Sequence, residues 1–214
     1  MTAVDDWAAR VLRHVDELGL RENTIVVFSS DHGDMLGSHH LFNKNQHYQE
    51  ATRIPLLVRW TGRIRPAIQD EQIISLVDVM PTILELCGVP RPPSVQGDSL
   101  APLLLGGKTI IGDNAAYIET TAHEGVRMKR YVYWRNRKNL KGEHLFDVEK
   151  DPYETRDVIA DPSYQRTLAR LRGMTDAWRE RTPSVPFEGH DAASRPASVP
   201  ARTPATSLTR GRPG

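Results

Sequence analysis

The sequence has little of several features that would point to particular classes of protein. It contains one cysteine, Cys87, which excludes an internal disulfide and leaves the redox compartment undecided. Its 28 basic and 27 acidic residues give a formal charge of +1, so the net charge indicates neither a nucleic-acid nor a membrane partner. No apolar run approaches the roughly 20 residues that span a bilayer. Residues 1–7 lack the basic and apolar regions of a signal peptide, so for the chain as given we expect a cytoplasmic protein.

The composition divides the 214 residues into a main part and a tail. The length suffices for one sizeable domain with a core and a small appendage. Hydrophobic residues make up 39% of the chain, and much of the shortfall from a typical globular composition lies in residues 183–214, which are rich in Pro, Ser, Ala, Thr and Arg. We expect this tail to be disordered. Near residue 113 the sequence pattern changes to short strand-like runs, and this change divides the main part. The predicted segments are therefore 1–112, 113–182 and 183–214.

The first segment has the pattern of an α/β domain. Residues 25–28 form an unbroken apolar run that is typical of a short strand buried on both faces of a parallel sheet, and residues 54–58 predict a second such strand. Apolar residues at helical spacing predict helices over 4–18 and 78–87, each ended by a glycine. With two buried strands in the segment, the predicted parallel sheet is incomplete and has an open edge.

The second segment has the pattern of a small antiparallel sheet with a helix. Four short strand-like runs are separated by Gly, Asn and charged turns, at residues 115–120, 125–128, 131–135 and 143–148. A helix over 162–181 follows, and its apolar side is expected to pack on the sheet. Arg127, Lys129 and Arg130 are interpreted as a solvated strand face.

The candidate site follows the first predicted strand directly. Asp31 and His32 stand side by side, where open α/β sheets place ligands, outside the carboxyl ends of their strands. A carboxylate oxygen and an imidazole nitrogen suit a divalent cation. Gly33 would let the backbone turn sharply around the ion. The pair therefore indicates part of a metal site.

Two ligands do not complete a metal site, and further donors are needed. The nearby candidates are Asp34, His39 and His40. Lys44, beyond a glycine-containing loop, would bring a positive charge to an anionic substrate. The alternative interpretation is that Asp31 caps a helix, His32 is a satisfied polar residue and Lys44 is solvated. The side chains that follow, Tyr48, Glu50 and Arg53, are interpreted as holding the loop rather than lining a pocket.

Several segments resemble signatures of the sulfatase family, within the alkaline-phosphatase-like superfamily that also includes phosphonate monoester hydrolases. The segment SSDHGDMLGSHHLFNKNQHYQEATRIPLLVRW, residues 29–60, is similar to the family's second conserved block. Four further matches follow the family order: LGLRENT at 18–24, ISLVDVMPTI at 74–83, QGDSL at 96–100 and LFDVEKDPYE at 145–154. Together they extend over about residues 4–178. The resemblance implies an incomplete alkaline-phosphatase-like domain followed by a sheet-and-helix subdomain.

The resemblance also implies roles for individual residues. Asp31 and His32 would be two ligands of a single divalent metal, Ca²⁺ or alternatively Mn²⁺. Lys44 would contact the sulfate or phosphonate oxygens, and His39 would stand at the pocket wall. The family's nucleophile, a formylglycine made from cysteine in Cys-x-Pro-x-Arg, precedes the matched region. Neither Cys87, in Cys-Gly-Val-Pro-Arg, nor Ser198, in the Pro-rich tail, is expected to replace it.

From the sequence we therefore expect a fragment of a metal-dependent sulfatase-like hydrolase that is inactive as the isolated chain. The alternatives are a fragment of a phosphonate or phosphate ester hydrolase, and a catalytically inactive truncated gene product. The expected partners are a small-molecule sulfate or phosphonate ester and the amino-terminal half of such an enzyme, with no nucleic acid and no membrane. The natural substrate, the metal and the oligomeric state do not follow from the sequence.

Overall fold

The computed structural model describes residues 2–107 and 110–182. The chain divides into two units, Met1–Arg181 and Thr182–Gly214, and the elements described below lie in the first. The predicted boundary between 1–112 and 113–182 lies inside the first unit and stays a prediction. The predicted disorder of 183–214 and the Ser198 motif lie outside the described residues.

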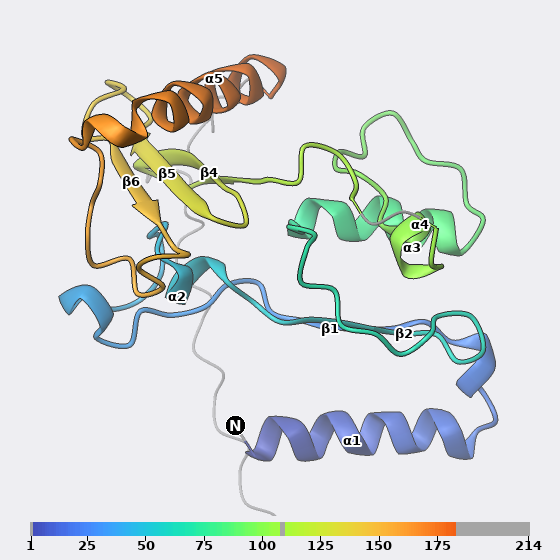
Figure 1. Cartoon of the computed structure of the whole chain (residues 1–214). Helices are drawn as coiled ribbons and strands as arrows, with labels where there is room; N and C mark the ends of the chain where they lie inside the picture. The colour runs from blue at the N-terminus through green and yellow to red at the C-terminus, as the bar shows by residue number, and fades with distance from the viewer. Residues whose placement is uncertain (1, 108–109, 183–214) are drawn as a thin grey trace, which may run out of the picture. The chain divides into compact units, whose positions relative to one another are not determined.

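The described part of the chain contains five α-helices, six strands and four 3-10 turns (Figure 1). The α-helices are α1 (Thr2–Glu17), α2 (Gln49–Thr52), α3 (Val79–Leu86), α4 (Ala101–Leu104) and α5 (Gln165–Arg181). The strands are β1 (Val26–Ser29), β2 (Leu56–Arg59), β3 (Ala116–Glu119), β4 (His123–Arg127), β5 (Tyr131–Asn136) and β6 (His144–Asp147). The 3-10 turns are η1 (Arg21–Asn23), η2 (Ser38–His40), η3 (Leu76–Asp78) and η4 (Pro162–Tyr164).

The two strands of the first segment pair antiparallel, so the expected parallel arrangement of these strands is wrong. Ser29 pairs with Leu56 and Val26 with Arg59, and the two strands run side by side in Figure 1. The connection therefore joins neighbouring ends of the two strands, which reverses the chain. Full burial on both faces was also wrong, because Phe28 is 41% and Leu57 59% exposed. An apolar run predicts a strand, but it contains no information about strand direction or about what covers each face.

The segments matching SLVD-x-x-PT and QG-x-SL are structural partners of each other. Asp78 accepts hydrogen bonds from the backbone N–H of Ser75 at 2.8 Å and of Asp98 at 2.9 Å. The Thr82 hydroxyl accepts one from the N–H of Leu100 at 2.8 Å. Burial raises the pKa of Asp78 above its ordinary value even though these N–H groups favour the ionised form. Side chains of the first signature therefore satisfy backbone N–H groups of the second.

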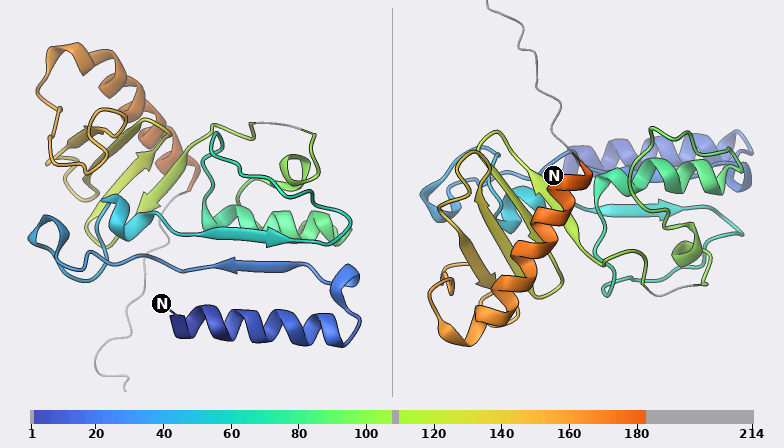
Figure 2. Two further views of the ribbon diagram at one scale, coloured as in Figure 1. Left: turned by 60° about the horizontal axis from the view of Figure 1, so that its bottom comes forward. Right: turned by 90° about the horizontal axis from the view of Figure 1, so that it is seen from above.

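The second segment is a four-stranded antiparallel sheet in the order β3-β4-β5-β6, as predicted. One face of the sheet presents Tyr133, which packs with Leu168 and Leu171 of α5. The opposite face presents Trp134, against which Tyr48 packs. Figure 2 shows α5 lying across the first of these faces. The alternation of strand side chains thus covers one face with a helix and leaves the other for the loop that follows the candidate site.

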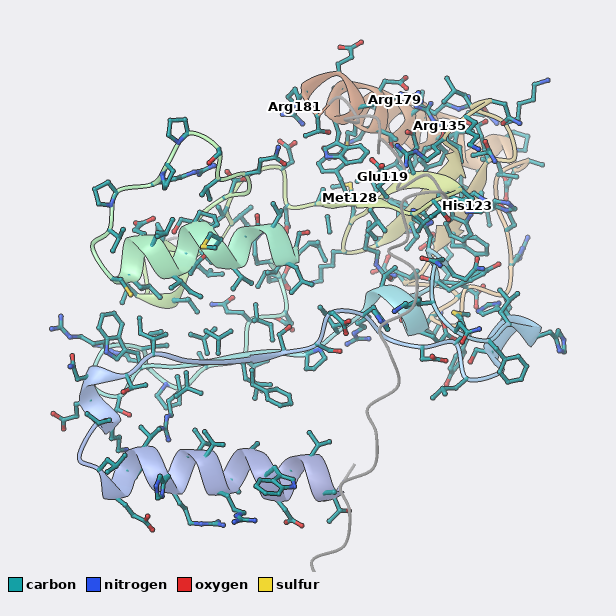
Figure 3. The ribbon with its side chains drawn as sticks, turned by 180° about the vertical axis from the view of Figure 1, so that it is seen from behind. Glu119, His123, Met128, Arg135, Arg179 and Arg181 are labelled. Carbon is teal, nitrogen blue, oxygen red and sulfur yellow. The ribbon has the colours of Figure 1, made fainter. Side chains whose placement is uncertain are left out.

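A buried network of charges joins the sheet to α5. Glu124 and Arg135, both at most 5% exposed, pair at 2.9 Å. Arg179 approaches the same carboxylate at 3.1 Å, and Asp176 contacts Arg135 from α5. Arg135 and Arg179 lie close together in Figure 3. Because each buried charge has a partner, the network holds the helix in register on the sheet at little net cost.

Candidate functional site

The loop that leaves β1 carries the predicted site. Asp31 is the second residue after the strand, and its side chain is 83% exposed. Its carboxylate Oδ1 accepts a hydrogen bond from the backbone N–H of His32 at 2.9 Å. This bond is the main reason that the pKa of Asp31 is lowered from its ordinary value, and the charges of His32 and Lys44 act in the same direction. Asp31 is therefore an open, ionised oxygen donor at neutral pH.

His32 has one nitrogen committed to the backbone and one directed at its neighbours. Its Nδ1 lies 2.6 Å from the carbonyl oxygen of Gly33, so Nδ1 carries the proton and donates it there. Its Nε2 then carries the lone pair, which accepts a hydrogen bond from Lys44 Nζ at 2.7 Å and lies 3.3 Å from Asp31 Oδ2. Such a tautomer is the one in which histidine can bind a metal through Nε2.

Gly33 is required for a reason other than the predicted sharp turn. Its backbone N–H donates to the carbonyl oxygen of Ala51 at 2.9 Å. A Cβ at this position would lie 1.9 Å from the carbonyl oxygen of Glu50. Only glycine allows the Asp31 loop to lie so close to the backbone of α2. The glycine thereby fixes the position of the site relative to α2.

Of the other predicted metal donors, Asp34 and His39 have contacts elsewhere, and His40 is exposed and does not line the cavity described below. Asp34 accepts a hydrogen bond from the N–H of Leu36 at 2.9 Å, as a turn-forming carboxylate does. His39 stacks on Tyr48 with 3.8 Å between ring centroids, and its Nε2 lies 3.8 Å from Glu50 Oε1. Within residues 2–107 and 110–182 no group of three or more His, Cys, Asp or Glu could hold a metal ion. The described chain therefore supplies a pair of adjacent donors, Asp31 and His32, rather than a complete ligand set.

A broad cavity of about 970 Å³ opens beside this pair. Asp31, His32 and Lys44 all line it. His39 is not among the lining residues. The remaining charged lining residues are Arg53, Asp70, Glu119, Arg127 and Lys129. The volume is at the upper end of the range for sites that bind small organic molecules.

The cavity wall contributed by the antiparallel sheet is held by a buried carboxylate. Glu154 is 1% exposed, and its oxygens bind Arg127 Nη1 at 2.8 Å and the backbone N–H of Gln49 at 2.9 Å. Burial raises the pKa of Glu154 and lowers that of Arg127. Arg127 is thus a partly buried, paired residue and not the solvated one expected. The sequence contained a signal for Glu154, the end of the DPYE segment, but none for its partners.

The loop between Lys44 and α2 is anchored on the sheet by His47, which the sequence did not single out. His47 is 1% exposed, and its Nε2 donates to the carbonyl oxygen of Ile118 at 3.1 Å. Its ring stacks on Trp134 with 5.6 Å between centroids. Burial lowers the pKa of His47 to about 4, so the ring is neutral at physiological pH. The anchor restrains the chain three residues from Lys44.

An Asp-His pair directly after a strand, contacted by a lysine and followed in the chain by a sheet-and-helix subdomain, fits the class of alkaline-phosphatase-like hydrolases. The comparisons with known proteins agree with this class. Residues 37–181 match the family described as "N-sulphoglucosamine sulphohydrolase, C-terminal". The chain belongs to this family of sulfatases.

Individual relatives come from the same group. The chain is 33% identical to an endo-4-O-sulfatase of Bacteroides thetaiotaomicron, over 83% of this chain and 41% of that protein. It is 32% identical to the multifunctional alkaline phosphatase superfamily protein PehA of Trinickia caryophylli, over 84% of this chain and 38% of that protein. The chain thus spans about two fifths of the length of these relatives.

Solved structures share the fold. A protein solved in complex with its substrate D-glucosamine-2-N,6-O-disulfate superimposes with a TM-score of 0.75 at 28% identity, over 84% of this chain and 39% of that one. A phosphonate monoester hydrolase from Silicibacter pomeroyi superimposes with a TM-score of 0.72 at 28% identity, over 83% of this chain and 39% of that one. The fold predicted from the sequence, a partial sulfatase domain, is confirmed. In the described residues no helix is long and apolar enough to cross a membrane.

Proposed function

We propose that the chain carries the metal- and anion-binding part of an active site that hydrolyses sulfate esters. The observation that supports this most directly is the meeting of three side chains at one corner of the cavity. Lys44 Nζ lies 2.7 Å from His32 Nε2, which lies 3.3 Å from Asp31 Oδ2. Because the chain belongs to a sulfatase family, the reaction proposed for these groups is the hydrolysis of a sulfate ester.

In this proposal Asp31 and His32 bind a divalent cation. The exposed carboxylate and the Nε2 lone pair, once Lys44 is displaced from it, fit such an ion, and the hard oxygen favours Ca²⁺, with Mn²⁺ as the alternative. When bound, the cation supplies Lewis-acid stabilisation of negative charge on the sulfuryl oxygens. The remaining ligands are proposed to come from the part of the relatives' length that this chain does not span.

Lys44 is proposed to bind the sulfate group. Its Nζ contacts His32 Nε2 at 2.7 Å and has no carboxylate within 4.0 Å in the described part of the chain, so its charge is available to an anion. The ammonium would stabilise charge that builds up on the sulfate oxygens during ester cleavage. His39 was predicted at the wall of the site, and it stays the weakest candidate, because it lies next to Glu50 and does not line the cavity.

The attacking group is proposed to be a formylglycine outside this chain. The substrate is then a small sulfate ester, and the isolated chain binds it without turning it over. Turnover by the chain alone, abolished by Ser198→Ala, would contradict this assignment. The third alternative, an inactive truncated product, is an inert remnant that retains metal binding at most.

A second candidate function is hydrolysis of phosphonate or phosphate esters. The likeness to the phosphonate monoester hydrolase of Silicibacter pomeroyi supports it, since a metal ion and a lysine serve a phosphonate as well as a sulfate. Calorimetric titration of the full chain with 4-nitrophenyl sulfate and with 4-nitrophenyl phenylphosphonate, each with Ca²⁺ or Mn²⁺, separates the two. We expect tighter binding of the sulfate ester, and its loss in Lys44→Ala. Tighter binding of the phosphonate ester would reverse the order of the proposals.

A further inference from the structure

Arg53 has an unusual environment for a residue expected only to hold a loop. It follows α2 directly, and its backbone N–H is fixed by a hydrogen bond to the carbonyl oxygen of Gln49 at 2.8 Å. Its side chain is exposed and lines the same cavity as Asp31, His32 and Lys44. The backbone is therefore held in place while the guanidinium faces open space.

The neighbouring cations of the cavity wall already have acidic partners. Arg127 pairs with buried Glu154 at 2.8 Å, and Lys129 pairs with Glu71. Arg53 has no carboxylate within 4.0 Å in the described residues. Its positive charge is also close enough to Arg127 to lower the pKa of that residue further, after the larger effect of burial. Two guanidinium groups that repel each other at a cavity surface favour an anion between or beside them.

The acidic residues of the cavity wall do not neutralise the positive charge of Arg53. Glu119 pairs with Arg137 at 2.6 Å, and Asp70 lies near Lys129 and contributes to raising the pKa of that residue. In the described part of the wall, Lys44 and Arg53 are the cations that lack an acidic partner. The cavity thus holds two separate places for negative charge.

We infer that Arg53 forms a second anion subsite, which binds a carboxylate or sulfate group carried by the substrate in addition to the ester sulfate at Lys44. The inference rests on the proposed function and names its substrate class, a sugar with two negative groups. A cavity of about 970 Å³ can hold a sugar ring that bridges the two subsites. The planar guanidinium can bind either oxyanion through two parallel hydrogen bonds.

The test compares ligands that differ in the second anion alone. The full chain with Ca²⁺ is titrated calorimetrically with N-acetylglucosamine 6-sulfate, which has one anion, and with D-glucosamine-2-N,6-O-disulfate, which has two. Glucose 2-sulfate and glucuronic acid 2-sulfate form the corresponding pair for a carboxylate. The variants are Arg53→Gln, Arg53→Lys and Lys44→Ala. Arg65→Gln is the matched control, because Arg65 is exposed and does not line the cavity.

We expect Arg53→Gln to weaken binding of the two-anion ligand about tenfold or more in at least one pair, and to leave one-anion ligands within about twofold. The pair that responds identifies the second group as sulfate or carboxylate. Arg53→Lys should keep part of the affinity, and Arg65→Gln all of it. Equal weakening of both members of each pair would overturn the inference, because Arg53 would then contact the ester sulfate. No effect on any ligand would also overturn it.

Failure of the proposed function has a different signature. If wild-type chain binds all four ligands no better than Lys44→Ala does, the sulfate site itself is wrong and the second subsite is overturned with it. Circular dichroism melting curves of all variants check that the chain remains folded. Because Arg53 is exposed, its replacement should leave these curves unchanged.

Discussion

Lys44 donates a hydrogen bond to Nε2 of His32 at 2.7 Å. The same nitrogen is the one that a metal ion would use, because Nδ1 is committed to the carbonyl oxygen of Gly33. A cation on Nε2 and the Lys44 ammonium therefore exclude each other from this lone pair. Metal binding should release Lys44 from His32 and turn its charge toward an anion.

This competition predicts that Lys44→Ala has opposite effects on the affinity for Ca²⁺ and on the affinity for the sulfate ester. The variant removes a competitor and a like charge, so Ca²⁺ affinity should rise roughly two- to fivefold. Sulfate-ester affinity should fall about tenfold or more, because a charged hydrogen bond is lost. Calorimetry with each ligand measures both, and Lys141→Ala, on an exposed turn, is the control. A fall in both affinities would mean that Lys44 does not compete for His32.

A second prediction separates the two acidic residues of the loop. Asp31→Asn should weaken Ca²⁺ binding about tenfold or more, because it removes a charged oxygen ligand. Asp34→Asn should change it less than about twofold, because the Asp34 carboxylate is used by the N–H of Leu36. Removal of metal with EDTA should abolish any difference between the two variants in sulfate-ester binding. Equal losses of Ca²⁺ affinity in both variants would contradict the assignment of Asp31, and not Asp34, as the metal ligand.

A third prediction concerns His39. His39→Ala should lower the free energy of unfolding by about 1 kcal/mol, because it removes the ring stacked on Tyr48. His39→Phe keeps a ring and should retain most of the stability in urea denaturation. Sulfate-ester binding by His39→Phe then tests the predicted place at the pocket wall. Binding equal to wild type would assign His39 to the support of the loop alone.

Buried His47 predicts a loss of stability in mild acid. Its pKa is about 4 in the folded chain and 6.5 ordinarily, so between these values the unfolded chain binds a proton that the folded chain does not. The free energy of unfolding should fall as the pH drops from 6.5 to 4, by roughly 3 kcal/mol in total, and not change from this cause above 6.5. The neighbouring ring of His123, whose pKa is also lowered by burial, adds to the same trend.

Urea denaturation at pH 4.5, 5.5 and 7 measures this dependence. His47→Gln cannot take up the proton and should show a flatter profile, even if its stability at pH 7 is lower. A profile as steep as that of the wild type would assign the acid sensitivity to other groups.

The buried pair of Glu154 and Arg127 predicts a large effect on stability. Glu154→Ala leaves the Arg127 guanidinium buried without a counter-charge, and it should cost about 3–5 kcal/mol. Glu149→Ala removes an exposed partner of Arg130 and should cost less than about 1 kcal/mol. The double variant Glu154→Ala/Arg127→Leu should recover part of the loss in urea denaturation. A double variant as unstable as the sum of the singles would show that the pair does not interact energetically.

Local chemistry of the sequence was sufficient for much of the fold and part of the site. Runs of alternating and apolar residues indicated the four-stranded sheet, α1, α3 and α5, because these patterns reflect which faces each element buries. The adjacency of Asp31 and His32 is a property of the chain itself, so the pair proposed to bind a metal was visible without coordinates. The roles of Asp31, His32, Lys44 and His39 stay predictions until the titrations are made.

Tertiary structure alone decided the features that require segments distant in the sequence to contact each other. The antiparallel pairing of β1 with β2 follows from where the connection between them returns, and the composition of the strands does not encode it. Gly33 is needed because Glu50 lies against it, and Arg53 faces the cavity while Arg127 is neutralised by Glu154. The sequence by itself determined which chemical groups are present. Long-range packing determined which of their charges remain free, because a counter-charge distant in sequence can lie next to one arginine and not the other.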